Sequence, residues 1–108
     1  MKKIIEHFGI DNQKRKFAEE NLELQEAILE YQIACRNAEG MAPDYVEEYL
    51  KPYRMHVIEE LADNFVILGE FMEWFRIKDY EIEGAARYKI GRTHHEIEKE
   101  NKKDELYR

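Results

Sequence analysis

The sequence predicts an all-α protein: a small helical bundle of two long antiparallel helices and a C-terminal helix. Apolar residues recur at helical spacing along 17–35 and again along 55–75, and no segment shows the alternating pattern of a half-buried strand. The chain has 108 residues, of which 44% are apolar, so it is long enough for one core of modest size. We therefore expect one domain over 1–108, with a core at about 7–97 and a charged tail at 98–108.

The first long helix is predicted to begin at Asp11 or Asn12 and to end near Asn37, because either of the first two side chains can cap a helix N-terminus. Residues 38–44 contain Gly, Pro and Asp at close spacing, which is typical of a loop.

A short helix over 45–50 and a longer helix from about Pro52 to Phe75 are predicted next, since proline fits the first turn of a helix. One kinked helix through Pro52 is the alternative. After a joint at 76–79, a last helix is predicted over 80–102.

Each long helix carries two separate apolar stripes. On the first helix, Leu22, Leu29 and Ile33 lie away from the main stripe, which consists of Phe17, Leu24, Ala27, Ile28, Tyr31, Ala34 and Cys35. One stripe per helix is enough for a core within the chain. The second stripe indicates that further copies of the chain cover it, in a homodimer or homotetramer, because so few helices would otherwise expose a large apolar area. Packing of four helices within one chain is the alternative.

Four carboxylates fall on surfaces that the helices would otherwise bury. At about 100° of rotation per residue, Glu20 and Glu23 lie among the apolar residues of the first long helix, whereas Glu19 projects the other way. On the second long helix, Glu60 and Asp63 begin the second apolar stripe. The main stripe there is Val57, Ile58, Leu61, Phe65, Leu68, Met72 and Phe75, and the second continues with Ile67, Phe71 and Trp74. A buried carboxylate without compensation loses several kcal/mol of hydration, so we expect cations beside these acids.

Each pair of acids has i, i+3 spacing, which places both carboxylates on one face of its helix. Packed helix axes lie about 8–10 Å apart, so pairs on neighbouring helices can converge on hard cations. Oxygen ligands of this kind favour Mg²⁺, with Mn²⁺ as an alternative, over zinc. One Glu-x-x-Glu string is common in a chain that is 38% charged, but a second acidic pair favours a metal site. A solvated or oligomer-facing acidic patch is the alternative.

Composition limits the partners that we expect. The net charge of −7 argues against nucleic acid as a partner, although metal ions can still join a nucleotide to an acidic site. The N-terminal residues show no signal-peptide pattern and no segment approaches about 20 uncharged residues, so we expect a cytoplasmic protein with no membrane partner. Cys35, the single cysteine, is expected to be a buried and unreactive thiol.

The chain contains three notable strings, which are Phe8-Gly9-Ile10-Asp11-Asn12-Gln13, Glu19-Glu20-Asn21-Leu22-Glu23-Leu24-Gln25-Glu26-Ala27-Ile28 and Glu59-Glu60-Leu61-Ala62-Asp63. Together they contain the pattern E-E-x-x-E followed by E-x-x-D. This combination resembles the MazG-like all-α nucleoside triphosphate pyrophosphohydrolases over roughly residues 7–97. The 36 residues between the two acidic motifs are a long separation for this family.

The resemblance implies Mg²⁺-dependent hydrolysis of an NTP or dNTP to the monophosphate and pyrophosphate, as in nucleotide-pool house-cleaning. It assigns metal binding to the four inward acids, Glu20, Glu23, Glu60 and Asp63. Glu19 would orient water or an outer metal ion.

The last helix carries Lys89-Ile90-Gly91-Arg92, which is similar to the basic stretch that follows the acidic motifs in this family. Lys89 and Arg92 lie one turn apart and would contact the polyphosphate. Two interpretations stay open beside this one. A phosphoribosyl-ATP pyrophosphohydrolase or an all-α dUTPase or dCTPase would share the acidic framework, and a non-enzymatic helical interaction module would use the acids as a surface patch.

Overall fold

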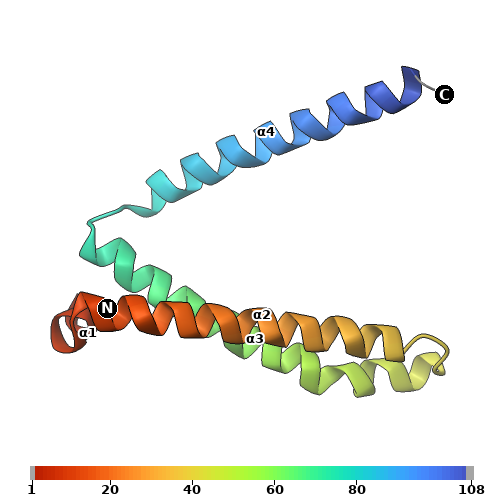
Figure 1. Cartoon of the computed structure of the whole chain (residues 1–108), viewed down its shortest axis with the longest axis horizontal. Coiled ribbons are helices and arrows are strands. Elements are labelled where there is room, and N and C mark those ends of the chain that lie inside the picture. Colours follow the sequence, from red (N-terminus) through yellow and green to blue (C-terminus); the bar gives the residue numbers. More distant parts are fainter. Residues whose placement is uncertain (1, 107–108) are drawn as a thin grey trace. The chain divides into compact units, whose positions relative to one another are not determined.

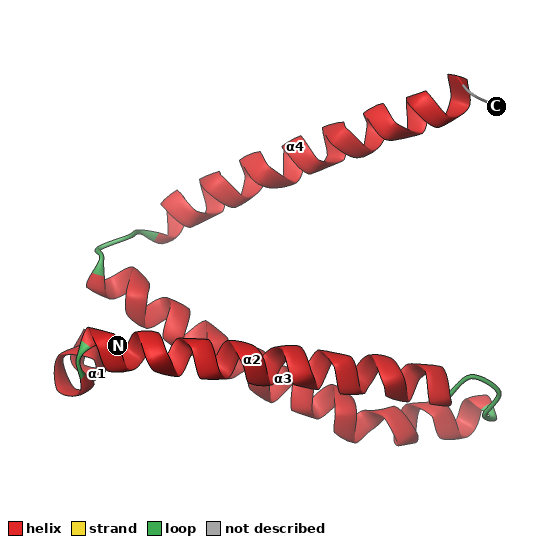
Figure 2. Cartoon of the chain, viewed as in Figure 1, coloured by secondary structure: helices red, strands yellow, loops and turns green. Residues whose placement is uncertain are grey.

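The computed structural model describes residues 2–106, with side chains from Ile4 onward, and all of its regular structure is helical. Four helices follow one another along the chain: α1 (Lys2–Phe8), α2 (Ile10–Asn37), α3 (Pro43–Trp74) and α4 (Asp79–Leu106). Figure 1 shows their order, and Figure 2 shows only helices and loops over these residues. The prediction of an all-α helical bundle is confirmed.

The chain divides into two compact units, Met1–Trp74 and Phe75–Arg108. The first unit contains α1, α2 and α3, and the second contains α4 and the turn before it. The acidic motifs belong to the first unit and the basic stretch belongs to the second.

Helix α1 lies outside the predicted elements, because a helix of 7 residues is too short to show a clear apolar period. Gly9 separates it from α2 with a φ of 82°, a conformation that glycine adopts readily. The N–H of Gly9 donates to the carbonyl oxygen of Ile5 at 2.7 Å, which closes the last turn of α1. Ile5 is fully buried, and α1 contacts both α2 and α3. This short helix therefore covers one end of the α2–α3 pair.

Helix α3 is one continuous helix through Pro52, so the prediction of a separate helix over 45–50 is wrong. Its first residue is Pro43, at a position where a backbone N–H would have no partner within the helix, so proline loses nothing there. Asp44 in the first turn complements the helix dipole. The loss of one N–H at Pro52 is not enough to end a helix of 32 residues that packs along α2. Residues 43–51, which precede the second acidic motif, therefore form the N-terminal part of α3.

Helices α2 and α3 form an antiparallel pair joined by a short turn, as Figure 1 shows. The rings of Phe17 and Phe71 meet edge to face with their centroids 5.9 Å apart. Most of the buried residues of the pair and its turn are small or polar: Gln13, Ala27, Ala34, Ala38, Asn64, Ile67 and Glu70. Small side chains on α2 allow the two backbones to approach closely.

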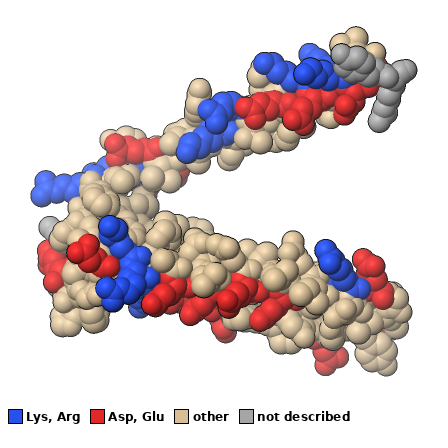
Figure 3. All heavy atoms as spheres, in the orientation of Figure 1, with Lys and Arg blue, Asp and Glu red and all other residues tan. Residues whose placement is uncertain are grey.

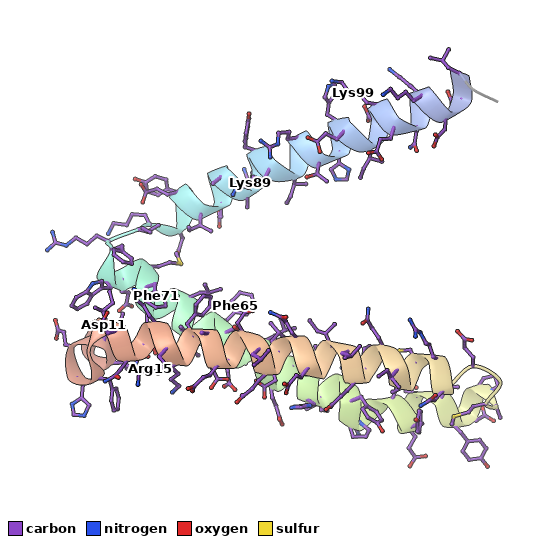
Figure 4. The ribbon with its side chains drawn as sticks, viewed as in Figure 1. Asp11, Arg15, Phe65, Phe71, Lys89 and Lys99 are labelled. Atoms are coloured by element: carbon purple, nitrogen blue, oxygen red, sulfur yellow. The ribbon has the colours of Figure 1, made fainter. Side chains whose placement is uncertain are left out.

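The stripe of α3 that packs against α2 is the second stripe, the one with the acids. Ile67 on this stripe is 3% exposed, whereas Phe65 on the main stripe is 71% exposed. Figure 4 shows Phe65 and Phe71 projecting from α3. The main stripe of α3 and the second stripe of α2 stay exposed at Leu22, Leu29, Ile33, Ile58, Leu61 and Leu68. Cys35 is also exposed, so the prediction of a buried thiol is wrong because α2 turns that side of its main stripe away from α3.

Helix α4 begins one residue before the predicted start and continues to Leu106, four residues beyond the predicted end. The N–H of Lys78 donates to Oε2 of Glu81 at 2.8 Å, which is one half of a capping box. The charged tail is thus helical as far as the structure describes it. Among residues 2–106, no helix combines the length and the apolar character needed to cross a membrane.

Candidate metal centre

Three predicted metal ligands converge in the first unit. Glu20 and Glu23 on α2 and Glu60 on α3 each offer one carboxylate oxygen, and these oxygens lie within 4.8 Å of one another. Two i, i+3 carboxylates on α2 thereby face a carboxylate from the opposite helix. The geometry confirms that Glu20, Glu23 and Glu60 come together, which was expected from the spacing.

The other two predicted acids lie differently. Asp63 is outside that group of three oxygens, but it lines a small cavity with Glu20, and its charge acts on both Glu20 and Glu60. Glu19 is exposed on α2 and does not belong to the group. Its role in orienting water stays a prediction.

Asn64 fixes the two helices at the level of the acids. Its Nδ2 donates to the carbonyl oxygen of Glu20 on α2 at 3.1 Å and to that of Glu60 on α3 at 2.8 Å. The side chain is 5% exposed, so these bonds lie in a water-poor interface, where they count for more than on a surface. Asn64 was not identified from the sequence. The available signal was its place between Glu60 and Ile67 on the stripe that packs.

The surroundings of Glu20 and Glu60 disfavour the charged form of both carboxyl groups. Burial raises the pKa of Glu20, and the charges of the other three motif acids raise it further. Burial also raises the pKa of Glu60, as do Glu23 and Asp63, while His56 lowers it. Since both desolvation and mutual repulsion act on this pair, a bound cation would relieve both.

The unpaired buried atoms of this interface are all acceptors. Within the described side chains, the buried polar atoms without a hydrogen-bond partner are five oxygens, on Gln13, Glu20, Glu60, Asn64 and Glu70. Buried acceptors require a donor, a proton or a cation, because otherwise they lose their hydration without replacement. Two of these oxygens, on Glu20 and Glu60, belong to the group of three converging carboxylates and could accept a proton or a cation.

Mg²⁺ holds oxygen ligands at about 2.0–2.1 Å in octahedral geometry, so neighbouring ligands of one ion lie about 3 Å apart and only opposite ligands reach about 4.2 Å. The three carboxylate oxygens lie within 4.8 Å of one another, so these side chains would have to draw together to hold one ion. Glu23 is exposed, which leaves room for such a movement. Carboxylate oxygens alone favour Mg²⁺ or Mn²⁺ over softer ions.

His56 lies between two acids at the edge of the cluster. Its Nε2 is 3.5 Å from Oε1 of Glu60, and its Nδ1 is 3.4 Å from Oε2 of Glu30. When the imidazole is protonated, it forms ion pairs with both carboxylates, one on each helix. This residue was also missed from the sequence, although its i, i+4 spacing from Glu60 was a usable signal.

A further acid, Glu70, lies beyond the cluster on the packed face of α3. It is 3% exposed, burial raises its pKa, and Lys16 acts in the opposite direction. It lines the small cavity, which has a volume of about 110 Å³ and is formed by Lys16, Glu20, Asp63, Val66, Ile67 and Glu70. Glu70 lies outside the acidic motifs and was not identified from the sequence. Its position one turn after Ile67, on the stripe that packs, was the available signal that it is buried.

Lys89 and Arg92 lie one turn apart on α4, in the second unit, and both are exposed. Figure 4 labels Lys89 on that helix. In the first unit, Figure 3 shows a row of acidic side chains along one face, with basic side chains gathered toward the α1 end. Contact of Lys89 and Arg92 with a polyphosphate stays a prediction.

No protein-family model, curated protein or solved structure matches this chain.

Proposed function

We propose that the protein is a Mg²⁺-dependent nucleotide pyrophosphohydrolase of the MazG-like type, which cleaves an NTP or dNTP to the monophosphate and pyrophosphate. The observation that carries this proposal is the convergence of Glu20, Glu23 and Glu60 from two helices, with buried oxygens of Glu20 and Glu60 left without partners. These residues are three of the four ligands that the E-E-x-x-E and E-x-x-D motifs imply.

Glu20, Glu23 and Glu60 would hold Mg²⁺, and Asp63 would complete the ligand set from the next turn of α3. Mn²⁺ would fit the same oxygens. When bound, the metal supplies neutralisation of phosphate charge and a water of lowered pKa. Asn64 keeps the carboxylates of the two helices in register, because it bonds to the backbone beneath Glu20 and Glu60.

The remaining residues would bind and orient the substrate. Lys89 and Arg92 would contact the polyphosphate, where charge-assisted hydrogen bonds are strong. Glu19 would orient water near the metal. Because substrates of this kind are nucleotides of the cellular pool, we place the activity in the cytoplasm, with house-cleaning of that pool as its role.

We propose a homodimer or homotetramer as the active form. The support is the set of exposed apolar side chains on the outer faces of both long helices, among them Leu22, Leu29 and Phe65. The same observation supports the second candidate, a helical interaction module without enzymatic activity. A phosphoribosyl-ATP pyrophosphohydrolase or an all-α dUTPase or dCTPase would use the same acids with a different pocket.

The test is pyrophosphate release from a panel of nucleotides, both canonical and modified, that also contains dUTP, dCTP and phosphoribosyl-ATP. We expect release that requires Mg²⁺ or Mn²⁺ and stops in EDTA, and the preferred substrate separates the enzyme classes. If no member of the panel releases pyrophosphate with either metal, the interaction module replaces the enzyme.

A further inference from the structure

The small cavity of about 110 Å³ beside the acidic cluster has a buried floor and an exposed rim. The floor is formed by Ile67 and Glu70 on α3, each 3% exposed, and the rim includes the exposed side chains of Lys16, Asp63 and Val66. At about 30 Å³ per water molecule, the cavity has room for about three waters, or for an ion with part of its hydration shell. Solvent and ions can therefore enter it from the rim.

The acids that line this cavity share one face of each helix. On α3, Asp63 and Glu70 are seven residues apart, so they lie within about 20° of each other around the axis. On α2, Lys16 precedes Glu20 by four residues, or about 40° around the axis. Asn64 contacts the backbone of Glu20, which places Glu70 about 9 Å further along α3. Because side chains lean toward the N-terminus of their helix and the two helices are antiparallel, Glu20 and Glu70 lean toward each other across the cavity.

Two of these carboxylates have a buried oxygen without a partner. Oε2 of Glu70 and Oε2 of Glu20 are both buried and accept no hydrogen bond. Glu70 lies outside the group of Glu20, Glu23 and Glu60, so a cation held by that group alone would leave it uncompensated. Burial raises the pKa of Glu70, and Lys16 acts in the opposite direction. A charged carboxylate in this position requires a positive partner, because a neutral water replaces hydrogen bonds but not charge.

Lys16 does not balance the charges that face the cavity. When ionised, Glu20, Asp63 and Glu70 each carry a negative charge, against the single positive charge of Lys16. The Lys16 side chain is also exposed, so its ammonium group can stay in water while its methylene groups form the rim. A hydrated Mg²⁺ ion suits the remaining charge, since it keeps several waters and needs only one or two carboxylates from the protein.

We propose that this cavity is a second cation site, in which Glu20 and Glu70 hold a partly hydrated Mg²⁺ or Mn²⁺ ion from opposite helices. Asp63 contacts the same ion through water at the rim. Glu20 has two carboxylate oxygens, so it can serve this site and the group with Glu23 and Glu60 at the same time. The second ion joins α2 to α3 beyond the acidic motifs and stabilises the helix pair. Its binding does not depend on the proposed function.

The test counts the Mn²⁺ ions bound per chain at neutral pH, from the electron paramagnetic resonance signal of free Mn²⁺. We expect Glu70→Gln to bind one ion fewer than the wild type, whereas Glu26→Gln, an exposed change on α2, should keep the wild-type number. Lys16→Gln should tighten binding of the Glu70-dependent ion by about fivefold, the upper end for a surface charge interaction, because it removes a competing positive charge. Mg²⁺ should displace the bound Mn²⁺.

The outcomes separate this site from the proposed function. Equal numbers of bound ions in the wild type and Glu70→Gln would overturn the second site and show that water or a proton occupies the cavity. A wild type that binds the Glu70-dependent ion but releases no pyrophosphate would leave the second site standing and overturn the hydrolase. Circular dichroism shows whether each variant keeps its helices, and Glu70→Met replaces Glu70→Gln if the latter unfolds.

Discussion

On α3 the buried face is the more polar one and the exposed face is the more apolar one, which is the reverse of what hydrophobicity alone predicts. The face that packs on α2 contains Glu60, Asn64 and Glu70, all of them shielded from water, while Phe65 and Leu68 on the outer face are 71% and 45% exposed. Burial of apolar area stabilises a fold and burial of carboxylates opposes it, so an isolated pair of helices would prefer the reverse arrangement. We infer that each face is completed by something else: cations on the inner face and a second copy of the chain on the outer face.

The largest expected effect tests the inner face. Glu60→Gln and Asp63→Asn should each lower kcat/KM for pyrophosphate release by about 100-fold or more, because each removes a ligand charge where phosphoryl charge develops. Steady-state kinetics at saturating Mg²⁺ measures this. Glu59→Gln is the control, since Glu59 is an exposed neighbour on α3 and should keep wild-type turnover. Near-normal rates in both site variants would show that the inner acids do not serve catalysis.

The next effect tests the outer face. Replacing Leu29 and Ile33 together by Gln should reduce the molecular mass measured by analytical ultracentrifugation, because these side chains are 56% and 47% exposed on the predicted contact surface. The variant should keep its helical circular dichroism, since neither residue is buried within the pair. A wild type that sediments as a monomer at micromolar concentration would contradict the predicted homodimer or homotetramer.

The acidic site was more predictable than the packing around it. Helical spacing was enough to expect Glu20 and Glu23 on one face of α2, because i, i+3 positions share a face whatever the helix packs against. Glu60 joins them as expected, whereas Asp63, expected in the same group, lies outside it. The choice between two apolar stripes on α3 was not predictable in the same way. It depends on the fit to small residues such as Ala27 and Ala34 on α2, which an apolar count does not measure.

The boundaries of the helices, like the packing, were harder to predict than the acidic site. Pro52 was a misleading signal, because the lost N–H is a local penalty whereas packing along the whole of α3 is a distributed gain. Asn64 and His56 escaped notice since neither belongs to an acidic motif. Each has one contact with Glu60 within α3, at i, i+4 spacing, and one contact with α2, and a single helix wheel contains only the first of these.

A smaller effect concerns Glu70, whose pKa is raised by burial from its usual value of 4.5. Between that value and the raised one, the folded chain binds more protons than the unfolded chain, so this residue lowers stability as pH increases through that range. Glu70→Gln should therefore raise the melting temperature at pH 7–8 in EDTA by a few °C, on the order of 1 kcal/mol, and by less near pH 4.5. Glu26→Gln, an exposed change on α2, should have little effect at either pH. A lower melting temperature for Glu70→Gln at neutral pH would mean that a positive group such as Lys16 stabilises the charged form.

The most direct test of the inner face is a thermal-shift titration of the wild type and Glu60→Gln with MgCl₂ or with NaCl at matched ionic strength. Because Mg²⁺ would bind the folded cluster far better than the unfolded chain, the wild-type stability should increase as RT ln(1 + [L]/Kd), about 2.7 kcal/mol at a hundredfold excess over Kd. MnCl₂ should act similarly, and the gain should shrink in mildly acidic buffer, where protons compete for Glu20 and Glu60. Glu60→Gln should lose most of the Mg²⁺ response. Identical curves in MgCl₂ and NaCl for both proteins would show that the converging carboxylates of α2 and α3 do not form a metal centre.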